Sequence, residues 1–327
     1  MRFGVLLNMG AQLGPTPSEV FDLALAQAEL AEELGYDELW VTEHHFIRFG
    51  INPSALTAAA FLLGRTRTIR VGTAVVLSPL CHPVDLAERA ALLDQLGNGR
   101  FELGLGRGGY RRDYEQLDVD FARWDDEPHA TVDRLLDLWS VRDTDTAIQP
   151  PPRTRPHPPV LMATSSEAGL KCATANGLAL QHYFATPVSA RVALEQRYRE
   201  LSGGAQPDHL HTVIAVVDES PDARERLATA LRRSFRSGDH AHVPRASQRH
   251  LGPDGRPIDP DGQAQLAAAG AIIGSVGQVV DELGDFVLAT GTRRLAVYHE
   301  AIGDPAATLR SLSDFADHVI PQLTPPG

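Results

Sequence analysis

The chain has 327 residues, 43% of them hydrophobic and 22% charged, and its 42 acidic and 30 basic residues give a formal charge of −12. This acidic balance disfavours a general nucleic-acid or anionic-membrane surface, while the length suffices for one barrel-sized domain or two smaller ones. Two distant cysteines, Cys81 and Cys172, indicate no disulfide framework, and no apolar run predicts a signal peptide or a membrane span, so we expect a soluble cytoplasmic protein.

Strands and helices alternate through the first third of the sequence. The first helix follows a capping-box pattern, with Thr16 at the N-cap, Pro17 in the first turn and Glu19 as the acid, and Gly35 ends it. The nearly continuous apolar run over 69–77 is typical of a parallel strand covered on both faces. The strands expected here cover residues 3–8, 38–42, 69–77 and 101–105, and the helices cover 17–34, 53–63 and 83–96.

The remaining two thirds repeat the alternation less regularly. The expected strands cover residues 160–162, 178–183, 211–217 and 295–299. The expected helices cover 132–139, 167–176, 187–201, 221–236, 276–288 and 304–319. A long insertion over 237–270, rich in Gly, Pro, His and Asp, precedes the last helix–strand units, and its composition suits a lid or a disordered surface loop equally well.

The eight strands, each followed by a helix, predict a parallel α/β sheet. In a chain of this length we expect a (β/α)8 TIM barrel that forms a single domain over 1–327, with a doubly wound open sheet as the alternative. A barrel carries its chemistry at the carboxyl ends of its strands. Polar residues follow the predicted strands there, namely Asn8, Glu43-His44-His45, Ser78, Arg107, Thr164-Ser165-Ser166 and His299-Glu300.

A glycine-dense loop follows the fourth predicted strand. Gly104, Gly106, Gly108 and Gly109 surround a single Arg107. Glycines let backbone N–H groups approach an anion, and arginine adds a bidentate fork for phosphate. The alternative is a flexible loop whose arginines face water.

The pair His44-His45 follows the second predicted strand. Adjacent residues in an extended segment point in opposite directions, so they share a metal ion poorly, and we expect no metal site. One imidazole can serve as a catalytic or ligand-contacting group, or it can pack as a structural side chain at the strand end. Glu43 can orient a ring or lie in a buried ion pair.

Several motifs agree in order and spacing with one known family over the first third of the chain, and a further match lies near the C-terminus. The matching segments are LWVTEHHF (39–46), TIRVGTA (68–74), HPV (82–84), LDQL (93–96), GRFELGLGRG (99–108) and IGSVGQV (273–279). Together they resemble the luciferase-like family of flavin-dependent monooxygenases. The segment RGGY (107–110), with Asp113 and Tyr114, is similar to the alpha subunit of bacterial luciferase in particular.

The resemblance implies that reduced FMN binds at the mouth of the barrel. Arg107, in the loop with Gly108, matches the family's phosphate-gripping arginine, and Thr164, Ser165 and Ser166 match its phosphate loop, where they can also serve as ordinary helix caps. The other matching positions are His44 for flavin hydroperoxide chemistry, Ala74-Val75 for a strained, sometimes cis, peptide under the flavin ring, and Glu167 as a weaker acidic candidate. Gly106 replaces the reactive cysteine of luciferases.

The function that this resemblance implies is a two-component monooxygenase acting on paired donors. A separate flavin reductase would supply reduced FMN, which would react with O2 to form a flavin hydroperoxide and oxygenate a small organic substrate. A deazaflavin-dependent hydride-transfer oxidoreductase and a non-catalytic flavin-binding homologue are the alternatives.

The second and third predicted helices, 53–63 and 83–96, are unusually apolar, which indicates a second buried face beyond the one that covers the sheet. We expect a two-fold homodimer through these helices, with a heterodimer with a sister subunit left open. Replacing Ala59 with Arg should then split the dimer and spare flavin binding.

Overall fold

The computed structural model describes residues 1–323 except 15, 127–128, 142–146 and 237–257. Eight parallel strands in this part of the chain close a barrel, because the last strand pairs with the first. In ring order they are β1 (Arg2–Leu7), β2 (Glu38–Val41), β3 (Arg70–Thr73), β5 (Phe101–Gly106), β6 (Val160–Met162), β7 (Ala179–His182), β8 (Leu210–Val213) and β11 (Arg294–Val297). The expected TIM barrel is confirmed, and the open-sheet alternative is wrong.

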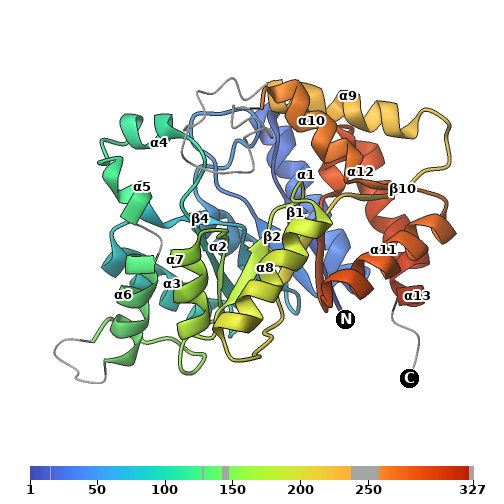
Figure 1. The fold of residues 1–327 in the computed structure, drawn as a ribbon. Coiled ribbons are helices and arrows are strands. Elements are labelled where there is room, and N and C mark those ends of the chain that lie inside the picture. Colours follow the sequence, from blue (N-terminus) through green and yellow to red (C-terminus); the bar gives the residue numbers. More distant parts are fainter. Residues whose placement is uncertain (15, 127–128, 142–146, 237–257, 324–327) are drawn as a thin grey trace.

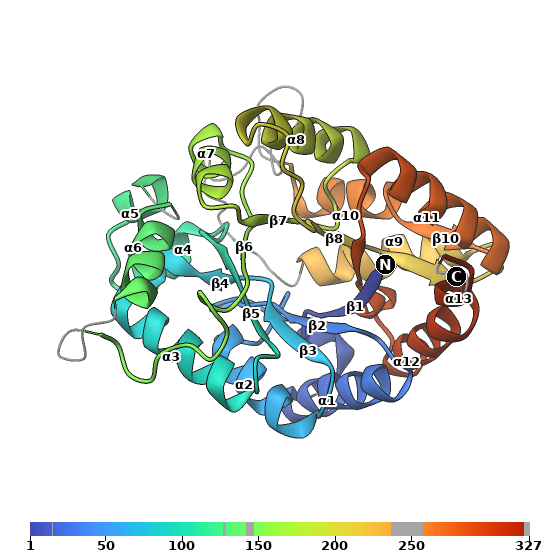
Figure 2. The same cartoon turned by 90° about the horizontal axis from the view of Figure 1, so that it is seen from below.

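Helices surround the barrel on all sides (Figures 1 and 2). Those that follow successive barrel strands are α1 (Pro17–Glu33), α2 (Ala55–Arg65), α3 (Pro83–Leu96), α6 (His129–Ser140), α7 (Glu167–Ala175), α8 (Val188–Leu201), α11 (Val276–Thr290) and α12 (Pro305–Asp314). Shorter or inserted helices are α4 (Arg111–Gln116), α5 (Ala122–Asp126), α9 (Ala223–Arg236), α10 (Pro260–Ala269) and α13 (Ile320–Leu323). None of the described helices is long and apolar enough to cross a membrane.

The predicted capping box of α1 is present. The Thr16 hydroxyl accepts a hydrogen bond from the Glu19 N–H, and the Glu19 carboxylate accepts one from the Thr16 N–H at 2.9 Å. Pro17 occupies the first turn, where the N–H that it lacks needs no partner. Short-range sequence signals therefore account for the position at which this helix begins.

Two predicted strands are each divided in the structure. The third ends at Thr73 and resumes as β4 (Val76–Leu77) after a cis peptide between Ala74 and Val75. The seventh ends at Val213, and the following β9 (Ala215–Val217) leaves the barrel to pair with β10 (Ile272–Gly274), a strand that we did not predict. A continuous apolar run does not show where its pairing partner changes.

The predicted insertion 237–270 is helical in its second part. Residues 237–257 lie outside the described part of the chain, so the expectation of a lid there stays a prediction. Asp259 caps α10, since its side chain accepts a hydrogen bond from the Gly262 N–H at 2.7 Å. Helix α10 packs closely along α9 above the barrel (Figure 1).

Buried ion pairs fill the N-terminal end of the barrel. Arg294 donates from Nε to the Glu38 carboxylate at 2.8 Å and also binds Glu102, whose carboxylate accepts from Arg70 Nε at 2.6 Å. The Trp40 indole lies above them and donates to Glu38 at 2.9 Å. Buried charges are tolerated only when they are paired in this way, and this network leaves the opposite end of the barrel for the site.

The apolar residues of α2 and α3 divide between two environments. Ala59 is 0% exposed and packs in the core of the subunit, whereas Phe61, Leu92 and Leu96 are 56%, 45% and 71% exposed. An arginine at position 59 would therefore damage the subunit itself. Ala59→Arg is the wrong test of a dimer, and Phe61 takes its place.

Candidate active site

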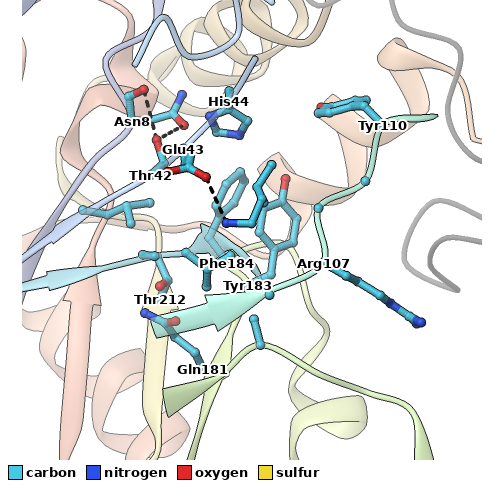
Figure 3. A pocket seen from close by; sticks show the side chains of 18 of the residues that line it. Asn8, Thr42, Glu43, His44, Arg107, Tyr110, Gln181, Tyr183, Phe184 and Thr212 are labelled. Atoms are coloured by element: carbon cyan, nitrogen blue, oxygen red, sulfur yellow. Dashed lines mark hydrogen bonds between the residues drawn. The ribbon is translucent and has the colours of Figure 1, made fainter. Parts of the chain in front are cut away.

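A cavity lies at the carboxyl ends of the barrel strands. It is bounded on one side by residues that follow β1, β2 and β3, and on the other by residues that follow β5, β6 and β7 (Figure 3). Among the predicted site residues, those that line it are His44, Ala74, Val75, Arg107, Gly108, Thr164 and Ser165. Residues far apart in the sequence therefore share one site.

The ring of His44 is held at the cavity wall. Its backbone N–H donates to the Asn52 carbonyl at 2.9 Å, and its imidazole meets the Phe49 ring edge-on, with centroids 5.3 Å apart. Gly50 adjoins the ring so closely that a Cβ there would lie 2.5 Å from His44 Nδ1. His45 does not line the cavity, as the alternation of an extended segment predicts.

Glu43 joins the end of β2 to two other segments. Its Oε1 accepts a hydrogen bond from the Leu77 N–H at 2.9 Å, and its Oε2 accepts one from the Ala55 N–H at 2.8 Å. The second contact places the carboxylate at the N-terminus of α2, where negative charge is favourable. The Nε2 atom of His45 lies 3.9 Å from Oε1, and the Glu43 carboxylate raises the pKa of His45. Glu43 therefore clamps the backbone of the site.

The segment Ala74-Val75 lies against the glycine-rich strand β5. A Cβ added to Gly106 would lie 2.6 Å from Val75 Cγ2. Just before this segment, the Thr73 hydroxyl accepts a hydrogen bond from the Gly104 N–H at 2.9 Å and donates one to the Gly104 carbonyl at 2.8 Å. The close approach of these two segments leaves position 106 no room for a larger side chain while Val75 is in place.

The loop that carries Arg107 is anchored. The Arg107 guanidinium stacks 3.8 Å above the Trp124 ring, and in Figure 3 it extends away from His44. The Tyr114 hydroxyl donates to the Arg107 carbonyl at 2.7 Å, and Trp124 Nε1 donates to the Gly108 carbonyl at 3.3 Å. Gly108 has a φ of +74°, which a side chain would disfavour. The alternative of a loose loop with arginines in water is wrong for Arg107.

The segment before α7 divides between cavity and cap. Thr164 and Ser165 line the cavity, whereas the Ser166 hydroxyl caps the helix by accepting from the Gly169 N–H at 3.1 Å. Glu167 does not lie at the site. At the first position of α7 its carboxylate turns outward, where it is 2.5 Å from Arg197 Nη2. Glu167 is therefore not among the residues that line the cavity, and its contact with a cofactor stays a prediction.

Several residues of the cavity were not predicted as site residues, although Tyr110 and Asp113 belong to a segment that matches the luciferase alpha subunit. Gln181 donates from Nε2 to the Thr73 carbonyl at 3.1 Å, and its Oε1 is buried without a hydrogen-bond partner in the described part of the chain. The other missed residues include Tyr110, Asp113, Tyr183, Phe184, Thr212 and Phe235. For Gln181, Tyr183 and Phe184 the sequence offers one signal, which is their position at the end of the predicted strand 178–183.

His182, Glu195 and His211 form a buried group with the residue types of a metal site. Arg191 Nη1 lies 3.4 Å from His211 Nδ1, and because arginine only donates, Nδ1 is the acceptor. The proton of His211 then lies on Nε2, which donates to Glu195 Oε1 at 2.6 Å. Burial lowers the pKa of His182 to about 4. We assign His211 and Glu195 to an internal hydrogen-bond network, on which the His182 ring stacks at 4.2 Å from the His211 ring.

The polar pair after the eighth barrel strand is also structural. Glu300 accepts hydrogen bonds from the backbone N–H groups of Asn8 and Met9 at 3.1 and 2.8 Å, and from Gln27 Nε2 at 3.0 Å. His299 is buried and lies 3.0 Å from the Ser311 hydroxyl. Both residues fix the turn after β11 and do not line the cavity.

The family model described as "Luciferase-like monooxygenase" matches residues 1–293. The chain belongs to the luciferase-like monooxygenase family. The alkanal monooxygenase alpha chain of Photorhabdus luminescens is 38% identical over 120 residues, which cover 37% of this chain and 33% of that protein. The match thus spans about a third of that relative's length. The oxygenase component of a flavin-dependent trigonelline monooxygenase from Acinetobacter baylyi is 28% identical over 193 residues, 55% of this chain and 54% of that protein.

Several solved structures share the barrel over nearly the whole chain. Monooxygenase RslO1 from Streptomyces bottropensis gives a TM-score of 0.82 at 23% identity, covering 99% of this chain and 100% of that one. The oxygenating constituent of 3,6-diketocamphane monooxygenase from Pseudomonas putida, in complex with FMN, gives 0.75 at 20% identity, with 100% and 99% covered. An F420-dependent secondary alcohol dehydrogenase gives 0.73 at 18% identity, with 99% of each chain covered. These likenesses establish the fold.

Proposed function

We propose that this chain is the oxygenase component of a two-component monooxygenase, which uses reduced FMN and O2 to oxygenate a small organic substrate in the cytoplasm. The observation that carries the proposal is the convergence of His44, Ala74-Val75, Arg107 and Thr164-Ser165 on one cavity. Membership of the luciferase-like monooxygenase family supports it. Reduced flavin would supply the two electrons that convert one oxygen atom of O2 to water while the other enters the substrate.

The chemistry of the cavity fits a flavin mononucleotide. Thr164 and Ser165 offer hydroxyl donors just before the N-terminus of α7, a favourable place for a phosphate, and Arg107 adds positive charge at the same wall. Ala74 and Val75 offer an apolar surface to a flat ring. The unpaired Gln181 Oε1 offers an acceptor to a ring N–H.

The remaining residues would protect and orient the reacting molecules. His44, fixed between Phe49 and Gly50, would donate or accept a proton at the reacting centre. Tyr183, Phe184 and Phe235 line the cavity, with Phe184 packed against the other two rings, and this aromatic wall would exclude water. This exclusion favours transfer of oxygen to the substrate over wasteful release of hydrogen peroxide.

The reductase would be a separate protein. The described chain forms a barrel with one small β9–β10 sheet, and it contains no second nucleotide-binding unit among its described residues. The trigonelline monooxygenase relative is itself named an oxygenase component. We further propose that two copies of the chain pair through the exposed apolar residues of α2 and α3.

Anaerobic titration with reduced FMN, and in parallel with reduced F420, tests the proposal. We expect saturable binding of reduced FMN, followed after admission of air by substrate-dependent oxygen uptake across a panel of small organic compounds. Binding of F420 alone would favour the hydride-transfer alternative, for which the F420-dependent dehydrogenase shares the fold. Binding of FMN without any oxygen chemistry would favour a non-catalytic homologue.

A further inference from the structure

Asp113 lines the cavity, and its buried carboxyl group has no hydrogen-bond partner among the described residues. The residue is 1% exposed and lines the cavity. Neither of its oxygens accepts a hydrogen bond from the part of the chain that the structure describes. The buried carboxylate of Glu43, by contrast, accepts two backbone N–H groups. Because buried polar groups are nearly always paired, the orphaned carboxyl points to a partner that the cavity receives.

Charged and titratable groups approach Asp113 from two elements. His45 and Glu43 come from the end of β2, and Arg112 and Tyr110 come from α4 and the residue before it. Burial raises the pKa of Asp113 to about 7, the charges of His45 and Arg112 lower it, and Glu43 raises it. Near pH 7 a substantial fraction of the carboxyl groups is protonated, and the protonated form is a hydrogen-bond donor.

We propose that Asp113 binds the organic substrate by donating a hydrogen bond from its protonated carboxyl to an uncharged oxygen acceptor of that molecule. The inference rests on the proposed function, since it names the substrate class for the same cavity. Tyr110, Tyr183 and Phe184 line the cavity with Asp113. A substrate with an apolar or aromatic body and a neutral oxygen acceptor matches both these rings and the Asp113 carboxyl group.

A cationic substrate fits these surroundings less well. It would require the ionised carboxylate, which both burial and the nearby Glu43 charge oppose. The Glu43 carboxylate raises the pKa of His45, which favours the cationic form of that ring beside Asp113, and Arg112 adds its own positive charge. Both effects disfavour a further cation in the cavity.

The test uses the full chain saturated with oxidised FMN and two molecules of the same skeleton. Acetophenone carries a neutral carbonyl, and 1-phenylethylamine carries an ammonium group at neutral pH. Dissociation constants are measured by ligand-observed NMR from about pH 5.5 to 8.5, which brackets the titration of Asp113. The variants are Asp113→Asn and, as a matched control, Asp118→Asn at an exposed aspartate on the loop after α4.

We expect acetophenone to bind wild-type protein about tenfold more weakly at a pH above the pKa of Asp113 than below it. This factor corresponds to the loss of one hydrogen bond. Asp113→Asn keeps an N–H donor at every pH, so its affinity stays high and independent of pH. Asp118→Asn keeps the wild-type profile. A 13C-carboxyl NMR titration of wild-type protein provides a test that needs no variant. Because acetophenone binds the protonated form, saturation with it should raise the titration midpoint of the Asp113 carboxyl from about 7 to about 8.

The inference is overturned if acetophenone fails to bind, binds independently of pH, or shows the wild-type pH profile in Asp113→Asn. It is also overturned if 1-phenylethylamine binds more tightly as pH rises and loses affinity in Asp113→Asn, because that pattern identifies a cation site. The affinity for reduced FMN is measured first and separately, by anaerobic titration. Its absence would refute the proposed function, and the acetophenone profile of the protein without FMN would still test the role of Asp113.

Discussion

Replacing Glu43 by Gln should destabilise the fold by about 2–4 kcal/mol. The two carboxylate oxygens each accept one backbone N–H, from Leu77 and from Ala55. An amide keeps one acceptor and turns its NH2 group toward the other N–H, so one charge-assisted hydrogen bond is lost and the second becomes neutral. Charge-assisted bonds contribute about 1.5–3 kcal/mol and neutral ones about 0.5–1.5 kcal/mol, which gives the expected range.

Urea unfolding followed by tryptophan fluorescence measures this loss, and Glu29→Gln is the matched control. Glu29 pairs with Arg65 at 2.6 Å, but both side chains are largely exposed. Exposed pairs contribute at most about 1 kcal/mol, so the control should change stability little. A loss below about 0.5 kcal/mol in Glu43→Gln, or one equal to that of the control, would refute the clamp that we assign to Glu43.

Three further predictions concern the cofactor, the chemistry and the assembly. Arg107→Ala should weaken reduced-FMN binding by about 1.5–3 kcal/mol, measured by anaerobic titration against Arg111→Ala, and unchanged affinity would contradict the phosphate role. His44→Ala should bind FMN normally but release hydrogen peroxide in place of product, and wild-type coupling would return His44 to a purely structural role. Phe61→Asp should convert a dimer into a species near the single-chain 35.4 kDa in sedimentation, and a wild-type protein that already sediments at that mass would refute the dimer.

The sequence predicted those cavity residues that directly follow the ends of barrel strands. His44, Arg107 and Thr164 were identified because each follows an apolar strand, and parallel strands end at the same edge of a barrel. The capping signals at Thr16 and Glu19 placed α1 correctly for a similar reason, since the interaction is confined to one turn.

The sequence is less informative where the outcome depends on distant contacts. Glu167 was a weaker cofactor candidate, and only the structure shows that its carboxylate pairs with Arg197 on α8. Asp113 lies on a short helix that no apolar periodicity marks, and only the structure shows that it is buried near the charges of His45 and Glu43 at the end of β2. Strand β9 was extended from β8 because two consecutive apolar strands look alike until their partners are known.

The close packing of Gly106 on Val75 couples the evolution of the two positions. A side chain at 106 would meet Val75 Cγ2 at 2.6 Å, so a relative with a larger residue at 106 has to carry a smaller or displaced residue at 75. Enlarging residue 106 alone crowds Val75, and shrinking residue 75 alone leaves a gap. Changing both together restores the packed volume. Across the family these two positions should therefore vary together. A Gly106→Cys substitution alone would clash with Val75 in this chain, so its effect would reflect packing and not the reactivity of the thiol.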